Sequence, residues 1–375
     1  MIYKNFKDKK LSFLGMGCMR FPMVDGNLEN VDMEKTAEIF DYAIKNGVNY
    51  FDTAWGYHNG QSEIVTGKIL SKYPRESFYL ADKFPGYDLA NIDKVEEIFE
   101  KQLQKTGVEY FDFYLIHNVC EKNINEYLDE KYRIFDHLVK QKAAGRIRHL
   151  GFSAHADMPS LKRFLEKYGH AMEFCQLQIN WVDWSFQRAK EKVELLRSYN
   201  IPVWVMEPVR GGKLARLSPK HEARLKALRP NESVAAWCFR FLQTALDATV
   251  VLSGMSDLSQ VQDNIKTCSQ EKPLTAEEQR VLNEITAEML VDMTPCTACR
   301  YCTEYCPQGL NIPELLELYN EHKFSNGGFI SPMRIGTMPE EKRPSACLAC
   351  RACEEVCPQS IKISDVLAAY AELLK

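Results

Sequence analysis

Eight of the 13 cysteines in this 375-residue chain lie between positions 296 and 357, and they form two copies of one pattern. The first copy runs CTACRYCTEYCPQ from Cys296, and the second runs CLACRACEEVCPQ from Cys347. The offset of 51 residues also relates Ile312 to Ile363. Because a reducing compartment keeps thiols free and an odd total argues against a complete disulfide framework, the pattern indicates metal binding.

Each copy has the spacing C-x₂-C-x₂-C-x₃-C-P, in which successive thiolates point into one pocket and the proline turns the chain away. The pattern resembles a bacterial two-cluster ferredoxin. The alternative is a pair of four-cysteine zinc sites, but those usually pair two C-x₂-C knuckles across a long gap. The resemblance implies that the fourth cysteine of each copy ligates the other cluster. One 4Fe–4S cluster would take Cys296, Cys299, Cys302 and Cys357, and the other Cys347, Cys350, Cys353 and Cys306.

Residues 1–270 alternate short apolar runs with amphipathic stretches. Strands are predicted at 13–18, 49–52, 77–83, 111–117, 147–153, 173–178, 202–206 and 248–252. Helices are predicted at 33–46, 62–72, 91–106, 130–144, 158–167, 186–198, 231–243 and 258–267. Eight such pairs favour a closed (β/α)₈ barrel over an open doubly wound sheet. Segments 4–6 and 11–13 are expected to form a hairpin that seals the barrel bottom.

One more helix is predicted over 275–293, where Thr275 and Glu278 have the spacing of a capping box. The alternation of strands and helices stops there. We therefore expect two domains, a barrel with its final linking helix over 1–293 and a small ferredoxin-like domain over 294–375. The segment 320–345, between the two cysteine copies, is expected to be a loop because it holds three glycines and three prolines.

Composition excludes several classes of protein. Hydrophobic residues are 45% and charged residues 26%, which is ordinary for a globular chain. The formal charge is −4, so no basic surplus points to nucleic acid or to an anionic membrane. No leader peptide or run of 18 apolar residues is evident, which predicts a cytoplasmic protein without membrane spans.

Four polar residues fall at or just after the predicted strand ends: Asp52, Tyr57, Lys83 and His117. The carboxyl ends of barrel strands face the active site, so these side chains are expected to converge. Taken singly, each has an ordinary explanation, such as a turn cap, a rim aromatic, a solvated lysine or a loop histidine. The joint pattern favours a site.

Residues 10–270 resemble the aldo-keto reductases. The matching stretches, in chain order, are Gly15-Met16-Gly17-Cys18, Phe51-Asp52-Thr53-Ala54-Trp55-Gly56-Tyr57, Ser62-Glu63, Lys83, Leu115-Ile116-His117, Gly151-Phe152-Ser153, Gln176 and Asp263-Asn264. The resemblance implies a (β/α)₈ barrel that reduces aldehydes and ketones with NAD(P)H. The chain likewise has no GxGxxG motif after a strand, which disfavours a Rossmann domain.

The chemistry explains why these residue types are needed. Hydride that arrives at a carbonyl carbon leaves an alkoxide that must be protonated, so Tyr57 is expected to act as general acid/base. Lys83 beside Tyr57 would lower the pKa of the phenol. Asp52 would hold Lys83 in place. His117 would orient the carbonyl oxygen by hydrogen bonding, or help to relay the proton.

The resemblance places Ser153 and Gln176 on the nicotinamide carboxamide, with Met206 where many members have a stacking aromatic. Gly254, Gln260 and Asn264 follow the eighth strand. Many NADPH-using members have Lys and Arg at the first two of these positions to hold the 2′-phosphate, and this chain has neither. NADH is therefore the expected cofactor, unless Arg210, Lys213 or Lys266 supplies the cation or nicotinamide binding itself is weakened.

Two function classes remain open from sequence. The first is an oxidoreductase that acts on a small carbonyl or alcohol substrate and carries two clusters for electron transfer, with a redox partner protein left open. The second is an inactive barrel scaffold whose ferredoxin-like tail is an electron-transfer or docking module. The four polar residues at the strand ends favour the first class. Trp55, His58, Phe84, Tyr87, His155 and Trp181 are further candidates for pocket lining.

Overall fold

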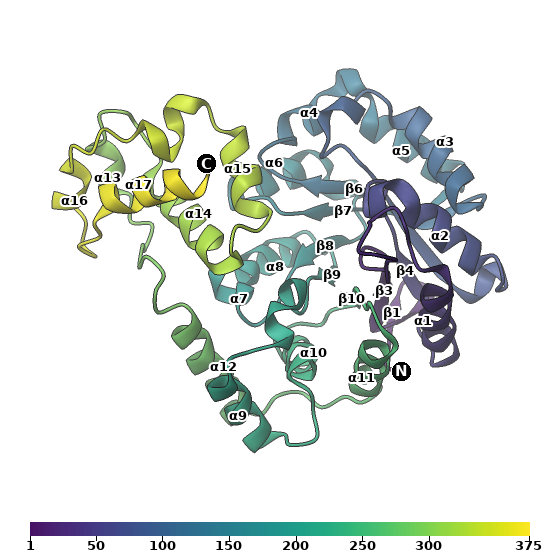
Figure 1. Ribbon diagram of the computed structural model, residues 1–375. Coiled ribbons are helices and arrows are strands. Elements are labelled where there is room, and N and C mark those ends of the chain that lie inside the picture. Colours follow the sequence, from purple (N-terminus) through teal and green to yellow (C-terminus); the bar gives the residue numbers. More distant parts are fainter. The chain divides into compact units, whose positions relative to one another are not determined.

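A computed structural model describes residues 1–375 of the chain. The chain divides into two compact units, Met1–Ile285 and Thr286–Lys375, and Figure 1 shows the elements of each. No helix combines the length and the apolar character that crossing a membrane requires.

Eight parallel strands of the first unit close into a barrel, in the order β10-β3-β4-β5-β6-β7-β8-β9. The strands are β3 (Leu14–Gly17), β4 (Tyr50–Asp52), β5 (Tyr79–Phe84), β6 (Phe111–Val119), β7 (Ile147–Ala154), β8 (Cys175–Gln178), β9 (Val203–Met206) and β10 (Val250–Ser253). Each predicted strand overlaps one of them, which confirms the (β/α)₈ barrel.

Helices follow the strands and surround the barrel (Figure 1). The predicted ones are α1 (Met33–Lys45), α2 (Gln61–Leu70), α3 (Val95–Thr106), α5 (Ile134–Ala143), α6 (Met158–Tyr168), α8 (Ala189–Ser198), α10 (Val234–Ala245) and α11 (Leu258–Cys268). Sequence analysis missed α4 (Ile124–Leu128), α7 (Asp183–Phe186) and α9 (Pro219–Leu228). Helix α9 buries only Leu225, so it has no apolar stripe to recognise.

The expected hairpin forms from β1 (Tyr3–Phe6) and β2 (Lys9–Ser12). Phe6 inserts into the barrel interior, where its ring centroid lies 5.0 Å from that of Trp204 and 5.8 Å from that of Phe113. These residues belong to one buried cluster that fills the barrel with side chains from the strands. The barrel is therefore a packed core, and the hairpin closes it at the amino-terminal ends of the strands.

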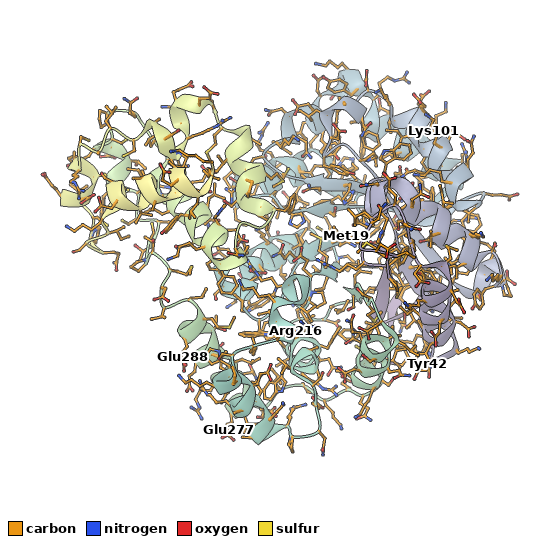
Figure 2. All side chains as sticks on the ribbon, viewed as in Figure 1. Met19, Tyr42, Lys101, Arg216, Glu277 and Glu288 are labelled. Atoms are coloured by element: carbon orange, nitrogen blue, oxygen red, sulfur yellow. The ribbon has the colours of Figure 1, made fainter.

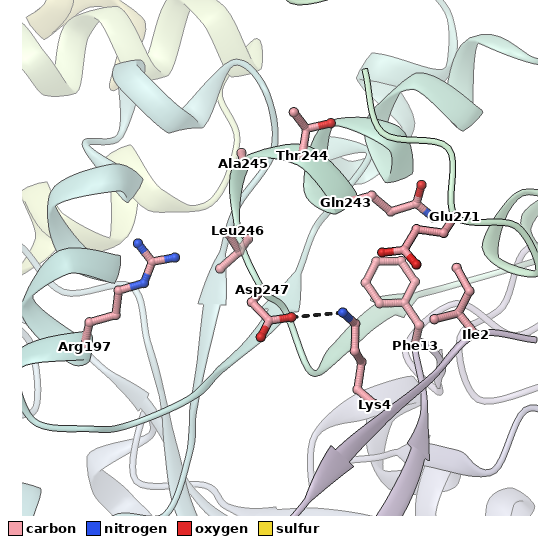
Figure 3. A pocket seen from close by; sticks show the side chains of 10 residues that line it. All are labelled: Ile2, Lys4, Phe13, Arg197, Gln243, Thr244, Ala245, Leu246, Asp247 and Glu271. Atoms are coloured by element: carbon pink, nitrogen blue, oxygen red, sulfur yellow. Dashed lines mark hydrogen bonds and ion pairs between the residues drawn. The ribbon is translucent and has the colours of Figure 1, made fainter. Parts of the chain in front are cut away.

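A hollow of about 340 Å³ lies at this same end of the barrel (Figure 3). Its lining includes Phe13, Leu246 and the ion pair between Lys4 Nζ and Asp247 Oδ1, at 2.9 Å. Asp247 is 86% exposed, so the pair contributes little to stability. The hollow lies at the opposite strand ends from Asp52 and Lys83.

The predicted capping box is confirmed at the start of α12 (Ala276–Met289). The backbone N–H of Thr275 donates to Glu278 Oε2 at 2.8 Å, and the N–H of Glu278 donates to Thr275 Oγ1 at 3.2 Å. Each residue thus satisfies a helix-end donor of the other.

The second unit contains α13 (Tyr301–Glu304), α14 (Ile312–Ser325), α15 (Ile330–Thr337), α16 (Ala352–Glu355) and α17 (Ile363–Leu373). The prediction of a loop over 320–345 was wrong, because α14 continues to Ser325 and α15 follows it. Asn326 ends α14 with φ 54°, and α15 buries Ile330 and Ile335. Pro332 lies in the first turn of α15, where its missing N–H has no partner to lose.

Candidate functional site

The four strand-end residues lie at the carboxyl-terminal mouth of the barrel. Asp52 is the last residue of β4, Lys83 is next to last in β5, and His117 lies near the end of β6. Tyr57 begins a short 3₁₀ segment, Tyr57–Gly60, in the loop after β4. Because these strands are parallel neighbours, the structure brings all four side chains to one end of the barrel.

Lys83 is fully buried and links the other members of the group. Its Nζ donates to Asp52 Oδ1 at 2.5 Å and to the backbone oxygen of Thr53 at 2.7 Å. The third contact is to the hydroxyl of Tyr57, at 3.5 Å. An ammonium group has three N–H donors, so this environment accounts for each of them.

The buried pair has the geometry of an ion pair. Burial raises the pKa of Asp52, and Lys83 opposes that rise. Burial disfavours the charge on Lys83, but the neighbouring Asp52 and Tyr57 outweigh it, so the pKa of Lys83 lies above its usual value. The short contact between the two groups fits a carboxylate that accepts from an ammonium.

The pKa of Tyr57 differs from the sequence expectation. Burial raises the pKa of this phenol above its usual value, and the charge of Lys83 only reduces the rise. The expectation of a net decrease was therefore wrong, because it left out desolvation. Tyr57 is protonated at neutral pH, which is the form that a proton donor needs.

His117 is neutral, because burial and the charge of Lys83 hold its pKa well below the usual range. Its ring packs edge-on against Tyr57 and Tyr87, with centroids 6.1 and 5.1 Å apart. Its Nδ1 is buried and has no hydrogen-bond partner. Such an orphan is costly and marks a place where a ligand oxygen or a water would be favourable.

The loop that carries Tyr57 has an unusual backbone, with His58 at φ 51° and Asn59 at φ 50°. His58, one of the candidates for pocket lining, is buried and packs against the segment that holds Phe21. Its Nε2 accepts from the N–H of Phe21 at 3.0 Å, and its ring stacks on that of Phe21. At Gly56, a side chain would start 2.3 Å from the Tyr87 hydroxyl, so any larger residue there would require Tyr87 to move.

The residues expected to hold nicotinamide lie at the same mouth. Ser153 and Gln176 are paired across β7 and β8. Ser153 Oγ accepts from the backbone N–H of Asn118 at 2.8 Å. Gln176 Nε2 donates to the second oxygen of Asp52, Oδ2, at 3.1 Å, which joins it directly to the Asp52–Lys83 pair. Met206 ends β9 and is half-buried.

The residues expected near the adenosine end lie after β10. The buried Asn264 donates to Ser253 Oγ at 3.1 Å. Gln260 is exposed, and its side chain accepts from the N–H of Ser256 and donates to Asp257. At Gly254, a side chain would start 3.1 Å from Cβ and Cδ of Arg20, so the stem of that arginine covers this glycine.

Of the cations considered as substitutes, Arg210 is already engaged. It is buried, and its Nε donates to both oxygens of the fully buried Asp183, each at 3.0 Å. Lys266 is exposed in the last turn of α11. Sequence analysis did not single out Arg20, because nothing local signals that its stem packs on Gly254.

In the second unit, one pocket is lined by Cys296, Cys299, Cys302 and Cys357 together with apolar side chains that include Leu316. This is the set that the ferredoxin resemblance implies for one cluster. Burial and the neighbouring cysteines raise the pKa of Cys302 to about 11, so the thiol keeps its proton until a cation binds nearby. The pocket fits a thiolate-ligated cluster.

The second copy has the same backbone as the first. Ala298 and Arg300 have φ values of 54° and 68°, and their counterparts Ala349 and Arg351 have 53° and 62°. Cys353 is buried like Cys302, whereas Cys299 and Cys350 are exposed; the remaining cysteines of the two copies are half-buried, namely Cys296, Cys306, Cys347 and Cys357. No three His, Cys, Asp or Glu side chains are grouped so that they could hold a single metal ion.

Comparisons with known proteins give separate matches for the barrel and for the cysteine-rich segment. Residues 13–287 match the Aldo/keto reductase family, and residues 295–361 match the 4Fe-4S dicluster domain. The second match favours iron–sulfur clusters over zinc sites.

The relatives are distant. The uncharacterized oxidoreductase YqkF of Bacillus subtilis is 25% identical over 75% of this chain and 94% of its own length. An NADH-specific methylglyoxal reductase of Escherichia coli is 26% identical over 55% of this chain and 66% of its own length. The holo form of an aldo-keto reductase from Bacillus halodurans is similar in fold, with a TM-score of 0.60 and 26% identity, over 76% of this chain and 96% of that one.

Proposed function

Because this chain belongs to the aldo/keto reductase family, we propose that it reduces a small aldehyde or ketone with NAD(P)H, or oxidises the corresponding alcohol. The observation that carries the proposal is the buried Lys83, whose ammonium contacts both the Asp52 carboxylate and the Tyr57 hydroxyl. Such an arrangement is suited to proton transfer at a carbonyl oxygen.

The chain's own residues would act on the oxygen of the substrate. NAD(P)H, when bound, supplies the hydride. Tyr57 donates its hydroxyl proton to the carbonyl oxygen as negative charge develops there. Lys83 stabilises the phenolate that remains, and Asp52 keeps the ammonium in place. The neutral His117, whose ring Nδ1 has no hydrogen-bond partner, orients the same oxygen by a hydrogen bond.

The nicotinamide end would lie against Ser153, Gln176 and Met206. Gln176 is suited to hold the carboxamide because its side-chain oxygen is an acceptor while its amide donates to Asp52. A nicotinamide carboxamide held by Gln176 would be linked through that side chain to the Asp52–Lys83 pair. Met206 offers a polarizable surface in place of an aromatic ring.

The second unit would hold two 4Fe–4S clusters, which transfer electrons one at a time. The first would take Cys296, Cys299, Cys302 and Cys357, and the second would take Cys347, Cys350, Cys353 and Cys306. NAD(P)H transfers two electrons together as hydride, whereas each cluster transfers one electron at a time. Because the two modes of transfer do not match, we propose that the clusters serve a redox partner protein. The four cysteines that line one pocket support the first ligand set.

Replacing Tyr57 tests the proposed acid. We expect Tyr57→Phe to lower kcat for carbonyl reduction by at least ~100-fold, while nucleotide binding is kept, since the lost hydroxyl acts in the transition state. In the wild type, kcat/KM should stay flat through neutral pH and fall as alkaline pH deprotonates Tyr57, whose pKa is raised. Tyr42→Phe, on α1, is the control (Figure 2). Near-wild-type turnover by Tyr57→Phe would require another acid.

Metal analysis tests the clusters. Protein reconstituted without oxygen should hold about eight iron atoms per chain, with the broad visible absorbance of iron–sulfur clusters, because each copy supplies four thiolates. Cys357→Ser should affect the cluster held mainly by the first copy, and Cys306→Ser the other. Stoichiometric zinc without visible absorbance would refute the assignment.

Nucleotide titration tests cofactor choice. We expect NADH to bind about tenfold more tightly than NADPH, because Gly254 and Gln260 carry no charge and Arg210 is bound to Asp183. The measurement is the Kd of each reduced nucleotide at fixed salt. Tighter binding of NADPH that Arg20→Gln abolishes would show instead that Arg20 supplies the missing cation.

A further inference from the structure

Helix α3 contacts the proposed site from outside the barrel, through Gln102. This side chain is fully buried. Its Nε2 lies 3.0 Å from each of three acceptors, namely the backbone oxygen of Lys83, Asp82 Oδ1 and Glu63 Oε1. Its Oε1 accepts from the Tyr114 hydroxyl at 2.5 Å. Gln102 therefore joins the end of β5, where Lys83 lies, to helix α2.

Lys105 follows one turn later on the same helix and lies next to the loop that carries Tyr57. Its ammonium forms an ion pair with the fully buried Glu63 and lies 4.4 Å from the ring centroid of Trp55. At the other end of the loop, a side chain added at Gly60 would start 3.5 Å from the same nitrogen. Lys105 thus contacts Trp55 at the start of the segment that holds Tyr57 and lies near Gly60 at its end.

Glu63 and Asp82 are two fully buried carboxyl groups that both accept from Gln102 Nε2. Two carboxyl groups that share a buried site disfavour each other's ionisation. Lys105 pairs with Glu63. Burial, together with the neighbouring Glu63, raises the pKa of Asp82 well above its usual value. Asp82 Oδ2 is buried and has no hydrogen-bond partner. Lys105 therefore supplies the cation that pairs with this buried acidic group.

We propose that Lys105, through Glu63 and Trp55, is a positioning residue that holds the Tyr57 loop against the strand end that carries Lys83. The inference rests on the proposed function of Tyr57 and Lys83. Their contact of 3.5 Å is long for a hydrogen bond, so a small displacement of the loop would remove it. Lys105 acts from outside the barrel and touches neither of these two residues in any described contact.

The test compares Lys105→Met with Lys101→Met. Lys101 lies one turn earlier on α3, is about half exposed and pairs with Glu97 at the surface (Figure 2). The readouts are kcat, KM and the pKa of Tyr57, followed by NMR of ¹³C-labelled tyrosine and assigned with Tyr57→Phe. Lys105→Met should lower kcat about tenfold with little change in KM and raise the pKa of Tyr57, because the phenolate loses the nearby ammonium of Lys83. Lys101→Met should change neither.

Rescue separates positioning from simple packing. Lys105→Arg should restore most of kcat, because a guanidinium group also pairs with a carboxylate and stacks on indole. Lys105→Met leaves Glu63 buried without its cation, so the double variant Glu63→Gln/Lys105→Met removes that charge and keeps the fold testable. The double variant should melt close to the wild type. Its Tyr57 pKa should still lie above the wild-type value, because the contact with Trp55 is lost.

Wild-type kcat and wild-type Tyr57 pKa in both Lys105→Met and the folded double variant would overturn the proposal. The NMR readout does not depend on turnover. If the wild type reduced no carbonyl compound, the proposed function would fail, while the change in the Tyr57 pKa would still decide whether Lys105 positions the loop.

Discussion

The site depends on one buried ion pair, between Lys83 on β5 and Asp52 on β4. Burying two charges costs free energy that their attraction only partly returns, so such a pair needs further hydrogen bonds to persist. Thr53 and Tyr57 supply them on the Lys83 side, and Gln176 supplies one on the Asp52 side. The pair is thus the centre of a connected polar group at the mouth of an otherwise apolar barrel.

The barrel supplies the rigidity that this group needs. Asp52 lies opposite Ala81 in the ladder between β4 and β5, and Lys83 lies two residues further on the same face as Ala81. Asp82, between them, points to the opposite face and meets Gln102 of α3. One strand end therefore presents Lys83 to the site and Asp82 to the surrounding helix, which connects the chemistry inside the barrel to packing outside it.

Sequence predicted the barrel and the convergence of Asp52, Lys83 and their neighbours because both follow from local patterns: strand periodicity and polar residues where strands end. It missed what depends on distant contacts. Three such contacts join residues remote in sequence: the hydrogen bond between His58 and Phe21, the hydrogen bonds of Gln102, and the packing of Arg20 on Gly254. The prediction of a loop over 320–345 was wrong because glycine and proline can occupy helix ends. The predicted net decrease in the pKa of Tyr57 was wrong because desolvation is a property of the folded environment.

The central claim is that Asp52 and Lys83 act as one unit on Tyr57, and a double-mutant cycle tests it most directly. The variants are Asp52→Asn, Lys83→Met and the combination, each checked for native melting, with kcat/KM for carbonyl reduction as the readout. Each single change should reduce kcat/KM by at least ~100-fold, and the double variant should lose little more than the worse single variant. Losses that multiply in the double variant, or Lys83→Met with substantial activity, would contradict the account.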